Sequence, residues 1–180
     1  VTMTKQMIQI ESTDPGTYEN AMADWITTQL APYPNVRLSR QEVLPGRPNL
    51  IAELTGDPSL PALVMICHMD TVVVGDGWTL PPFDAIEKDG KIYGRGACDM
   101  KSGLACCLSA FQYAAETLQT SGKTPKQTLK LICSMDEEDF MRGSEACIQA
   151  GWVTDHDWVI DAEPTNGQIQ MAHKGRTWYE

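Results

Sequence analysis

The sequence predicts an α/β fold: a mixed, mostly parallel sheet covered by helices on both faces, which makes a three-layer αβα sandwich. Short apolar runs alternate along the chain with longer segments whose apolar residues recur at about a 3.6-residue period. Turn-forming residues separate the two kinds of segment, and no repeat, low-complexity tract or linker divides the chain. The order strand, helix, strand, helix, strand is typical of a parallel sheet with helices on both sides.

The first part of the chain is expected to form two helices followed by three strands. In chain order these are helices over residues 2–10 and 17–30 and strands over residues 36–43, 49–54 and 62–67. Pro32 and Pro34 end the second helix because proline cannot continue a helix. The run 62–67 is the most apolar of the three, which indicates a strand buried on both faces.

The remaining part begins with a loop rich in glycine and proline over residues 74–85. It is followed by a hairpin over 86–93, a helix over 101–118, a strand over 128–135, a helix over 143–150, and strands over 158–160 and 168–172. Trp158 is expected to pack within its strand.

Composition favours one globular domain over residues 1–180, with 42% hydrophobic and 21% charged residues. The six cysteines form no CxxC pair and lie in apolar runs, so we expect reduced, mostly buried thiols. No apolar run reaches the roughly 18 residues that span a bilayer, and the amino terminus lacks a signal pattern. We therefore expect a cytoplasmic protein with no membrane partner.

The net charge of -10 argues against a nucleic-acid partner, because phosphate binding requires a basic patch and the 14 lysines and arginines are scattered. Most of the 24 acidic residues can serve a soluble surface. A dense acidic cluster would instead need a cation to offset the repulsion between its carboxylates.

Candidate metal ligands follow the ends of the predicted strands. His68 and Asp70 follow the strand 62–67, and they point to the same side of an extended chain. A metal-bound histidine usually gives its second ring nitrogen to an oxygen acceptor, a role open to Asp70. Taken alone, His68 is more simply interpreted as a histidine that caps a core strand.

Two further strands end in acidic residues. Glu137 and Glu138 follow the strand 128–135, and Glu163 follows the strand 158–160. In parallel sheets, ligands bind beyond the carboxyl ends of the strands, so we expect these side chains to meet at one edge. The acidic turn could also be a solvated loop or the start of a helix.

One histidine with several carboxylates suits zinc, cobalt or manganese. The number of candidate ligands indicates two metal ions about 3.5–4 Å apart, as in two-metal hydrolases. Asp99, in a glycine-rich turn, is the candidate bridging ligand. Of Glu137 and Glu138, one could bind metal while the other takes a proton from a water molecule.

Four blocks carry a resemblance to a known family: HMDTV at 68–72, the stretch GDGWTLPPFDAIEKDGKIYGRGACDMKSG at 75–103, MDEED at 135–139 and DAEPT at 161–165. In this order and spacing they resemble the acetylornithine deacetylase, succinyl-diaminopimelate desuccinylase, aminoacylase and glutamate carboxypeptidase family of dizinc metallohydrolases. The resemblance covers nearly the whole chain.

The resemblance implies a role for each candidate residue. His68 and Glu163 bind the first zinc ion, and Asp70 orients His68. Asp99 bridges both ions and is followed by a cis peptide bond. Glu138 binds the second ion, and Glu137 is the general base.

Asp161 is a rival to Glu163, because the two residues lie on the same side of an extended chain, but the EPT match favours Glu163. His173 lies outside the matched blocks and is expected to be a surface or core histidine.

The resemblance also implies what this chain lacks. Family members are longer, with an inserted lid and dimerisation domain and a returning carboxy-terminal part that supplies a last histidine to the second metal. We therefore expect residues 1–180 to be the amino-terminal part of the catalytic domain, inactive alone, and the whole protein to form a homodimer. The expected substrate is a small molecule, an N-acyl amino acid. A dipeptidase or carboxypeptidase of the same family and a non-catalytic metal-binding protein remain alternatives.

Overall fold

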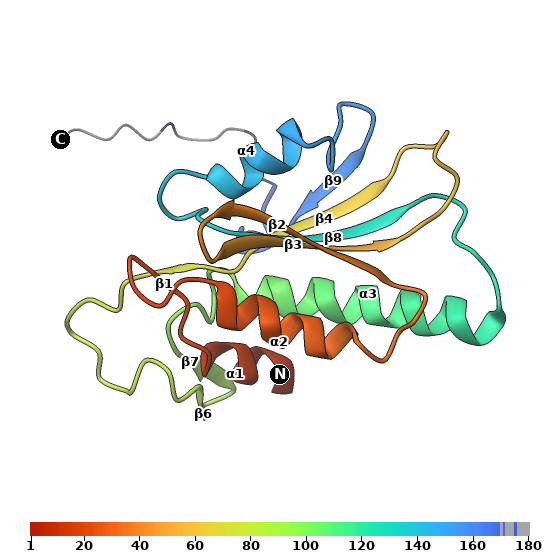
Figure 1. The fold of residues 1–180 in the computed structure, drawn as a ribbon. Coiled ribbons are helices and arrows are strands. Elements are labelled where there is room, and N and C mark those ends of the chain that lie inside the picture. The colour runs from red at the N-terminus through yellow and green to blue at the C-terminus, as the bar shows by residue number, and fades with distance from the viewer. Residues whose placement is uncertain (170, 172–174, 176–180) are drawn as a thin grey trace.

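A five-stranded sheet forms the centre of the molecule (Figure 1), which a computed structural model describes at residues 1–169, 171 and 175. Its strands lie in the order β2-β3-β8-β4-β9. Their bounds are Arg37–Leu44 for β2, Arg47–Leu54 for β3, Leu63–His68 for β4, Leu129–Ser134 for β8 and Trp158–Asp161 for β9. The strand β4, which ends at His68, lies between β8 and β9.

The sheet is mixed, as the sequence predicts. β4 pairs in parallel with both β8 and β9, whereas β3 is antiparallel to β2 and to β8. Four strands therefore share one direction, and β8, β4 and β9 end at the same edge of the sheet.

Helices cover both faces of this sheet and complete the three layers (Figure 1). On one face, α2 (Asn20–Leu30) packs on β3, and α3 (Lys101–Ser121) packs on β4 and β8. The short helix α1 (Thr2–Ile8) packs against α3. On the other face, α4 (Arg142–Gln149) packs on β2 and β3.

The central strands are buried on both faces because their successive side chains alternate between two cores. Along β4, Met65 and Cys67 belong to the core beneath α2 and α3, while Val64 belongs to the smaller core on the α4 side. This double burial explains why the sequence of β4 is apolar throughout.

The predicted helices and strands up to residue 161 are confirmed with shifted ends. The second helix begins at Asn20 instead of residue 17, because Thr13–Asp14 forms the short strand β1, which pairs with β5 (Thr71–Val72). The long helix continues to Ser121 and ends at Gly122, whose φ of 64° gives the left-handed conformation common at helix ends.

The predicted hairpin is present as β6 (Ile86–Lys88) and β7 (Lys91–Tyr93). Its two turn residues, Asp89 and Gly90, have φ values of 52° and 71°. Positive values at both positions are typical of the tight turn that matches the twist of a hairpin.

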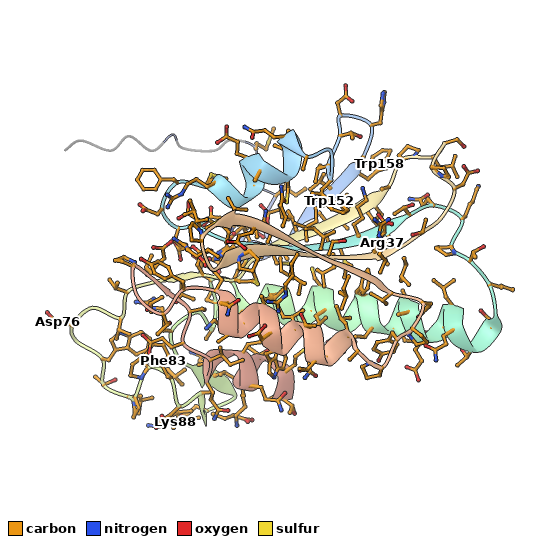
Figure 2. All side chains as sticks on the ribbon, in the orientation of Figure 1. Arg37, Asp76, Phe83, Lys88, Trp152 and Trp158 are labelled. Carbon is orange, nitrogen blue, oxygen red and sulfur yellow. The ribbon has the colours of Figure 1, made fainter. Side chains whose placement is uncertain are left out.

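The prediction that Trp158 packs within its strand is wrong. All four residues of β9 are exposed, and Trp158 is 68% exposed. It lies on the edge strand, far from the loop that carries Asp76 and Phe83 (Figure 2). The predicted strand 168–172 falls partly outside the described residues, and His173 lies outside them.

All six cysteines are free, and Cys67, Cys107, Cys133 and Cys147 are buried, as composition predicts. Within the part of the chain that the structure describes, no helix has the length and apolar character needed to cross a membrane.

Candidate metal centre

The edge of the sheet where β4, β8 and β9 end gathers a histidine and several carboxylates. His68 is the last residue of β4 and is only 2% exposed. Its Nε2 atom lies 3.0 Å from Oδ1 of Asp99, 3.4 Å from Oε1 of Glu163 and 3.8 Å from Oε2 of Glu137. The structure thus brings together residues from four separate segments of the chain.

The second ring nitrogen fixes the orientation of His68. Nδ1 lies 2.8 Å from the backbone carbonyl oxygen of Asp70, to which it donates a hydrogen bond. A proton on Nδ1 leaves the lone pair of Nε2 available to a metal ion on the side of Asp99 and Glu163.

Asp70 acts on His68 differently from the sequence-based expectation. Its carboxylate lies 3.7 Å from Nδ1, which is too long for a hydrogen bond. The carboxylate instead accepts hydrogen bonds from the backbone N–H groups of Glu137, at 3.1 Å, and Glu138, at 3.0 Å. Asp70 therefore orients the imidazole through its carbonyl group and holds the acidic turn through its carboxylate.

The electrostatics of the cluster favour a cation. Burial alone would lower the pKa of His68, but the hydrogen bond with Asp99 and the neighbouring negative charges raise it to about 9. Burial, with nearby negative charge, raises the pKa of Glu163 to about 7. These carboxylates repel one another and stabilise positive charge placed among them.

His68, Asp99 and Glu163 each offer an atom within 4.8 Å of the others, an arrangement that could hold a metal ion. The nitrogen and oxygen donors match the ligands that catalytic zinc uses. Asp161, the rival candidate, is not a member of this group.

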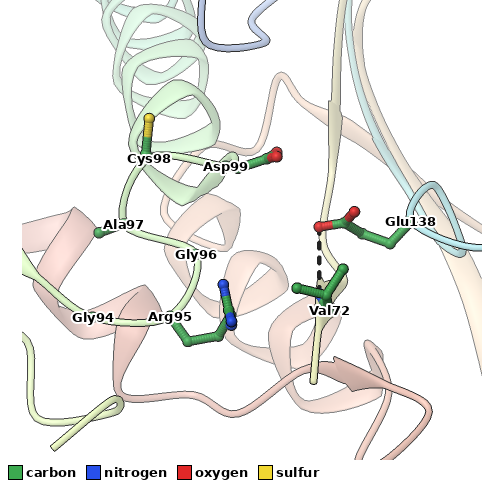
Figure 3. A pocket seen from close by; sticks show the side chains of 8 residues that line it. All are labelled: Val72, Gly94, Arg95, Gly96, Ala97, Cys98, Asp99 and Glu138. Atoms are coloured by element: carbon green, nitrogen blue, oxygen red, sulfur yellow. Dashed lines mark hydrogen bonds between the residues drawn. The ribbon is translucent and has the colours of Figure 1, made fainter. Parts of the chain in front are cut away.

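Asp99 and Glu138 also line a pocket of about 200 Å³ (Figure 3). Asp99 precedes α3, and Glu138 comes from the turn after β8, so the two carboxylates reach the pocket from different elements. Glu138 accepts a hydrogen bond from the backbone N–H of Val72 at 3.3 Å. The hydrogen bond from His68 lowers the pKa of Asp99 most. The positive charge of Arg95, which lines the same pocket, lowers it further.

Glu137 is half-buried beside this group, and burial raises the pKa of its carboxyl. A carboxylate with a raised pKa next to candidate metal ligands is suited to accept a proton.

The peptide bond between Asp99 and Met100 is cis, as the family resemblance implies.

Several supporting contacts at the site cannot be read from the sequence. Gly103 allows the carbonyl oxygen of Ala162 to approach α3 so closely that a Cβ atom at Gly103 would lie 2.3 Å from it. Glu163 is the next residue, so this close contact sets its distance from α3. Ser12 donates a hydrogen bond to the carbonyl oxygen of Met69 at 2.7 Å and so supports the segment after β4.

Comparison with known proteins agrees with this geometry. Residues 64–174 match the peptidase family M20/M25/M40. The chain is 40% identical over 131 residues to a probable succinyl-diaminopimelate desuccinylase of Staphylococcus aureus, and the match covers 72% of this chain and 31% of that protein. It is 37% identical over 116 residues to a succinyl-diaminopimelate desuccinylase of Bradyrhizobium, covering 61% and 29%.

Solved structures share the fold. An M20 family metallo-carboxypeptidase from Sulfolobus solfataricus superposes with a TM-score of 0.68 at 21% identity, covering 89% of this chain and 36% of that one. Human carnosine dipeptidase 1 gives a TM-score of 0.64 at 21% identity, covering 89% and 37%. The chain thus spans about a third of the length of the proteins it matches.

A histidine and several carboxylates at the carboxyl edge of a mixed α/β sheet are typical of the class of α/β proteins that bind a metal ion where their strands end. Within this class, the chain belongs to the peptidase family M20/M25/M40, since the family match covers more than half of its residues.

Proposed function

We propose that this chain is the amino-terminal part of the catalytic domain of a zinc-dependent amidohydrolase that removes the acyl group from an N-acyl amino acid. The observation that carries the proposal is the group formed by His68, Asp99 and Glu163. One buried imidazole whose Nε2 faces two carboxylates gives the donor set of a catalytic metal site, because three protein ligands leave a position open to substrate.

In this proposal His68 and Glu163 hold a first metal ion, Asp99 is shared, and Glu138 holds a second ion on the pocket side. A bound divalent ion would supply Lewis acidity toward the substrate carbonyl and acidify a water molecule. Cobalt or manganese could replace zinc at the same donors.

Glu137 is the proposed general base. It accepts a proton from the attacking water and later delivers that proton to the nitrogen of the leaving amine. Its place supports the role, because its carboxylate lies 3.8 Å from Nε2 of His68 and its backbone N–H is held by Asp70. A protein that only binds metal would have no need of a carboxylate there.

The proposed substrate class rests on the desuccinylases, which share 37–40% identity with this chain. A dipeptidase or carboxypeptidase activity is the second candidate, because the structures that share the fold include human carnosine dipeptidase 1 and a metallo-carboxypeptidase. In this proposal, polypeptide outside this chain provides the last histidine ligand, the lid and the homodimer contacts.

The test is the change Glu137→Gln in the complete polypeptide that contains this chain. Removing the base should lower kcat by roughly 10²–10⁴-fold, the usual contribution of a general base, while zinc affinity stays near that of the wild type. Steady-state rates on a panel of N-succinyl amino acids, N-acetyl amino acids and dipeptides measure the effect and separate the two substrate classes.

Glu145→Gln is the matched control, since Glu145 lies on α4 and accepts a hydrogen bond from Gln149, one turn later on the same helix. It should leave the rates unchanged. Near wild-type activity in Glu137→Gln would remove Glu137 from the role of base, and absence of turnover by the wild type would favour a metal-binding protein without catalysis.

A further inference from the structure

A buried cluster of charges contacts the acidic turn 136–138 and does not include His68, Asp99 or Glu163. At its centre is Arg47, the first residue of β3, whose side chain is 9% exposed. Its Nε and Nη2 atoms donate to the carboxylate of Glu19 at 2.9 and 2.5 Å. Nη2 also donates to Asp14 at 2.5 Å, and the ring of Tyr18 stacks 4.1 Å from the guanidinium.

This cluster reaches the acidic turn through Glu19 and also through Arg47, whose Nη2 atom lies 3.4 Å from Oδ1 of Asp136. Oε1 of Glu19, which pairs with Arg47, also accepts a hydrogen bond from the backbone N–H of Asp136 at 3.2 Å. Asp136 directly precedes Glu137, and its φ of 62° is rare for a residue other than glycine.

Three consecutive backbone N–H groups are therefore held by two buried carboxylates. Glu19 accepts from residue 136, while Asp70 accepts from residues 137 and 138. A side chain leaves its Cα in a direction fixed by the backbone, so these three bonds set where Glu137 and Glu138 point.

Three carboxylates can be ionised together in this space only if positive charge offsets their repulsion. Oxygen atoms of Asp14, Glu19 and Asp70 lie within 4.8 Å of one another, and all three residues are buried. The guanidinium of Arg47 supplies the positive charge, and its planar fork holds Glu19 through two bonds.

We propose that Glu19 and Arg47 are positioning residues that fix the turn at 136–138 and thereby place Glu137 for proton transfer and Glu138 for metal binding. Neither contacts the substrate. The proposal rests on the function proposed above, because it gives Glu137 and Glu138 their roles.

The chain contains a matched control for this pair. Asp24 and Arg40 also join α2 to the β2–β3 hairpin, at 2.5 Å, but on the exposed surface and away from the acidic turn. Removing this ion pair tests whether the loss of any ion pair between α2 and the β2–β3 hairpin changes exchange in the acidic turn or kcat.

The test uses the complete polypeptide and the changes Glu19→Met, Glu19→Gln, Arg47→Lys and Asp24→Asn. Hydrogen–deuterium exchange followed by mass spectrometry compares the peptide covering residues 135–141 with the peptide covering β8. In Glu19→Met, which removes the acceptor for the N–H of residue 136, exchange in the acidic turn should rise at least tenfold and in β8 less than threefold.

Steady-state kinetics give the second measurement. In Glu19→Met, kcat should fall at least tenfold while KM stays within threefold. Glu19→Gln, which keeps an acceptor oxygen, should recover most of the activity. Arg47→Lys keeps the positive charge but not the planar guanidinium, so its kcat should lie between those of Glu19→Met and Glu19→Gln. The kcat of Asp24→Asn should match that of the wild type.

Wild-type exchange in the acidic turn of Glu19→Met would overturn the proposal, and so would equal acceleration in the turn and in β8, which would indicate general loss of stability. If Glu19→Met does not fold, Arg47→Lys decides by the same criteria, since it keeps the buried charge. Exchange requires no turnover, so this result is independent of whether Glu137→Gln abolishes amide hydrolysis.

Discussion

The two faces of the central sheet bury different numbers of side chains, and the edge strand β9 buries none. The candidate metal centre takes one ligand from the end of a buried strand and another from the segment after β9. Beneath α2 and α3, a large cluster of fully buried side chains includes Leu104, Leu108 and Phe111. On the α4 side the cluster is small and is built around Ile51 and Ile132. The edge strand β9 is exposed along its length.

The strands that lead to the candidate ligands differ in the same way. His68 ends β4, whose side chains enter both cores, and is itself almost fully buried. Glu163 follows the exposed strand β9, and the carbonyl oxygen of the residue before it, Ala162, lies close to Gly103 on α3. The core therefore holds His68 in place, whereas a close backbone contact supports the segment that carries Glu163.

The largest expected effect follows from damage to the large core. Phe111 is completely buried on α3. Replacing Phe111 with Ala should lower the free energy of unfolding by about 3–5 kcal/mol, because it removes apolar contacts and leaves a cavity. Urea denaturation measures the loss. Tyr113→Ala, at a 74% exposed position of the same helix, is the control and should change stability by less than about 0.5 kcal/mol. Equal losses in the two variants would contradict the assignment of the core.

A smaller effect, specific to the site, is expected at Gly103. Replacing it with Ala adds a Cβ atom 2.3 Å from the carbonyl oxygen of Ala162, so the segment that carries Glu163 must move away. Zinc affinity should fall by roughly tenfold, the lower end of the cost of disturbing residues that support metal ligands. Isothermal titration with zinc measures it.

Ser109→Ala, on the exposed side of the same helix, is the matched control for Gly103 and should bind zinc like the wild type. Because alanine favours a helix more than glycine does, the free energy of unfolding should change little while affinity falls. Unchanged zinc affinity in Gly103→Ala would show that the contact with Ala162 does not place Glu163.

The sequence predicted the layers of the fold because the strong signals are local. The apolar run of β4 and the regular apolar spacing of α2 each follow from which faces are buried. The exposed β9 has the same apolar character as a buried strand, so pattern alone could not distinguish them. The strands β1 and β5 were missed because two-residue strands carry no periodicity.

That the candidate ligands lie close together was also predictable, since each follows a strand end or lies in a glycine-rich turn within a matched block. Their supporting residues were not. Glu19 and Arg47 are 28 positions apart in the chain and pair only because α2 packs on β3. A tertiary contact of this kind leaves no spacing or composition signal in one sequence. The carboxylate of Asp70 likewise serves the acidic turn, a partner that only the folded chain brings near.

The smallest expected effect is at Trp158 on the edge strand. A tryptophan that is 68% exposed contributes little burial. Replacing it with Ser should therefore change the free energy of unfolding of this chain by no more than about 0.5 kcal/mol. Urea denaturation checks this, with Trp152→Ser as the contrasting variant, because Trp152 packs against the small core on the α4 side and should cost more. A loss at Trp158 as large as that at Trp152 would mean that β9 is covered by another molecule in solution.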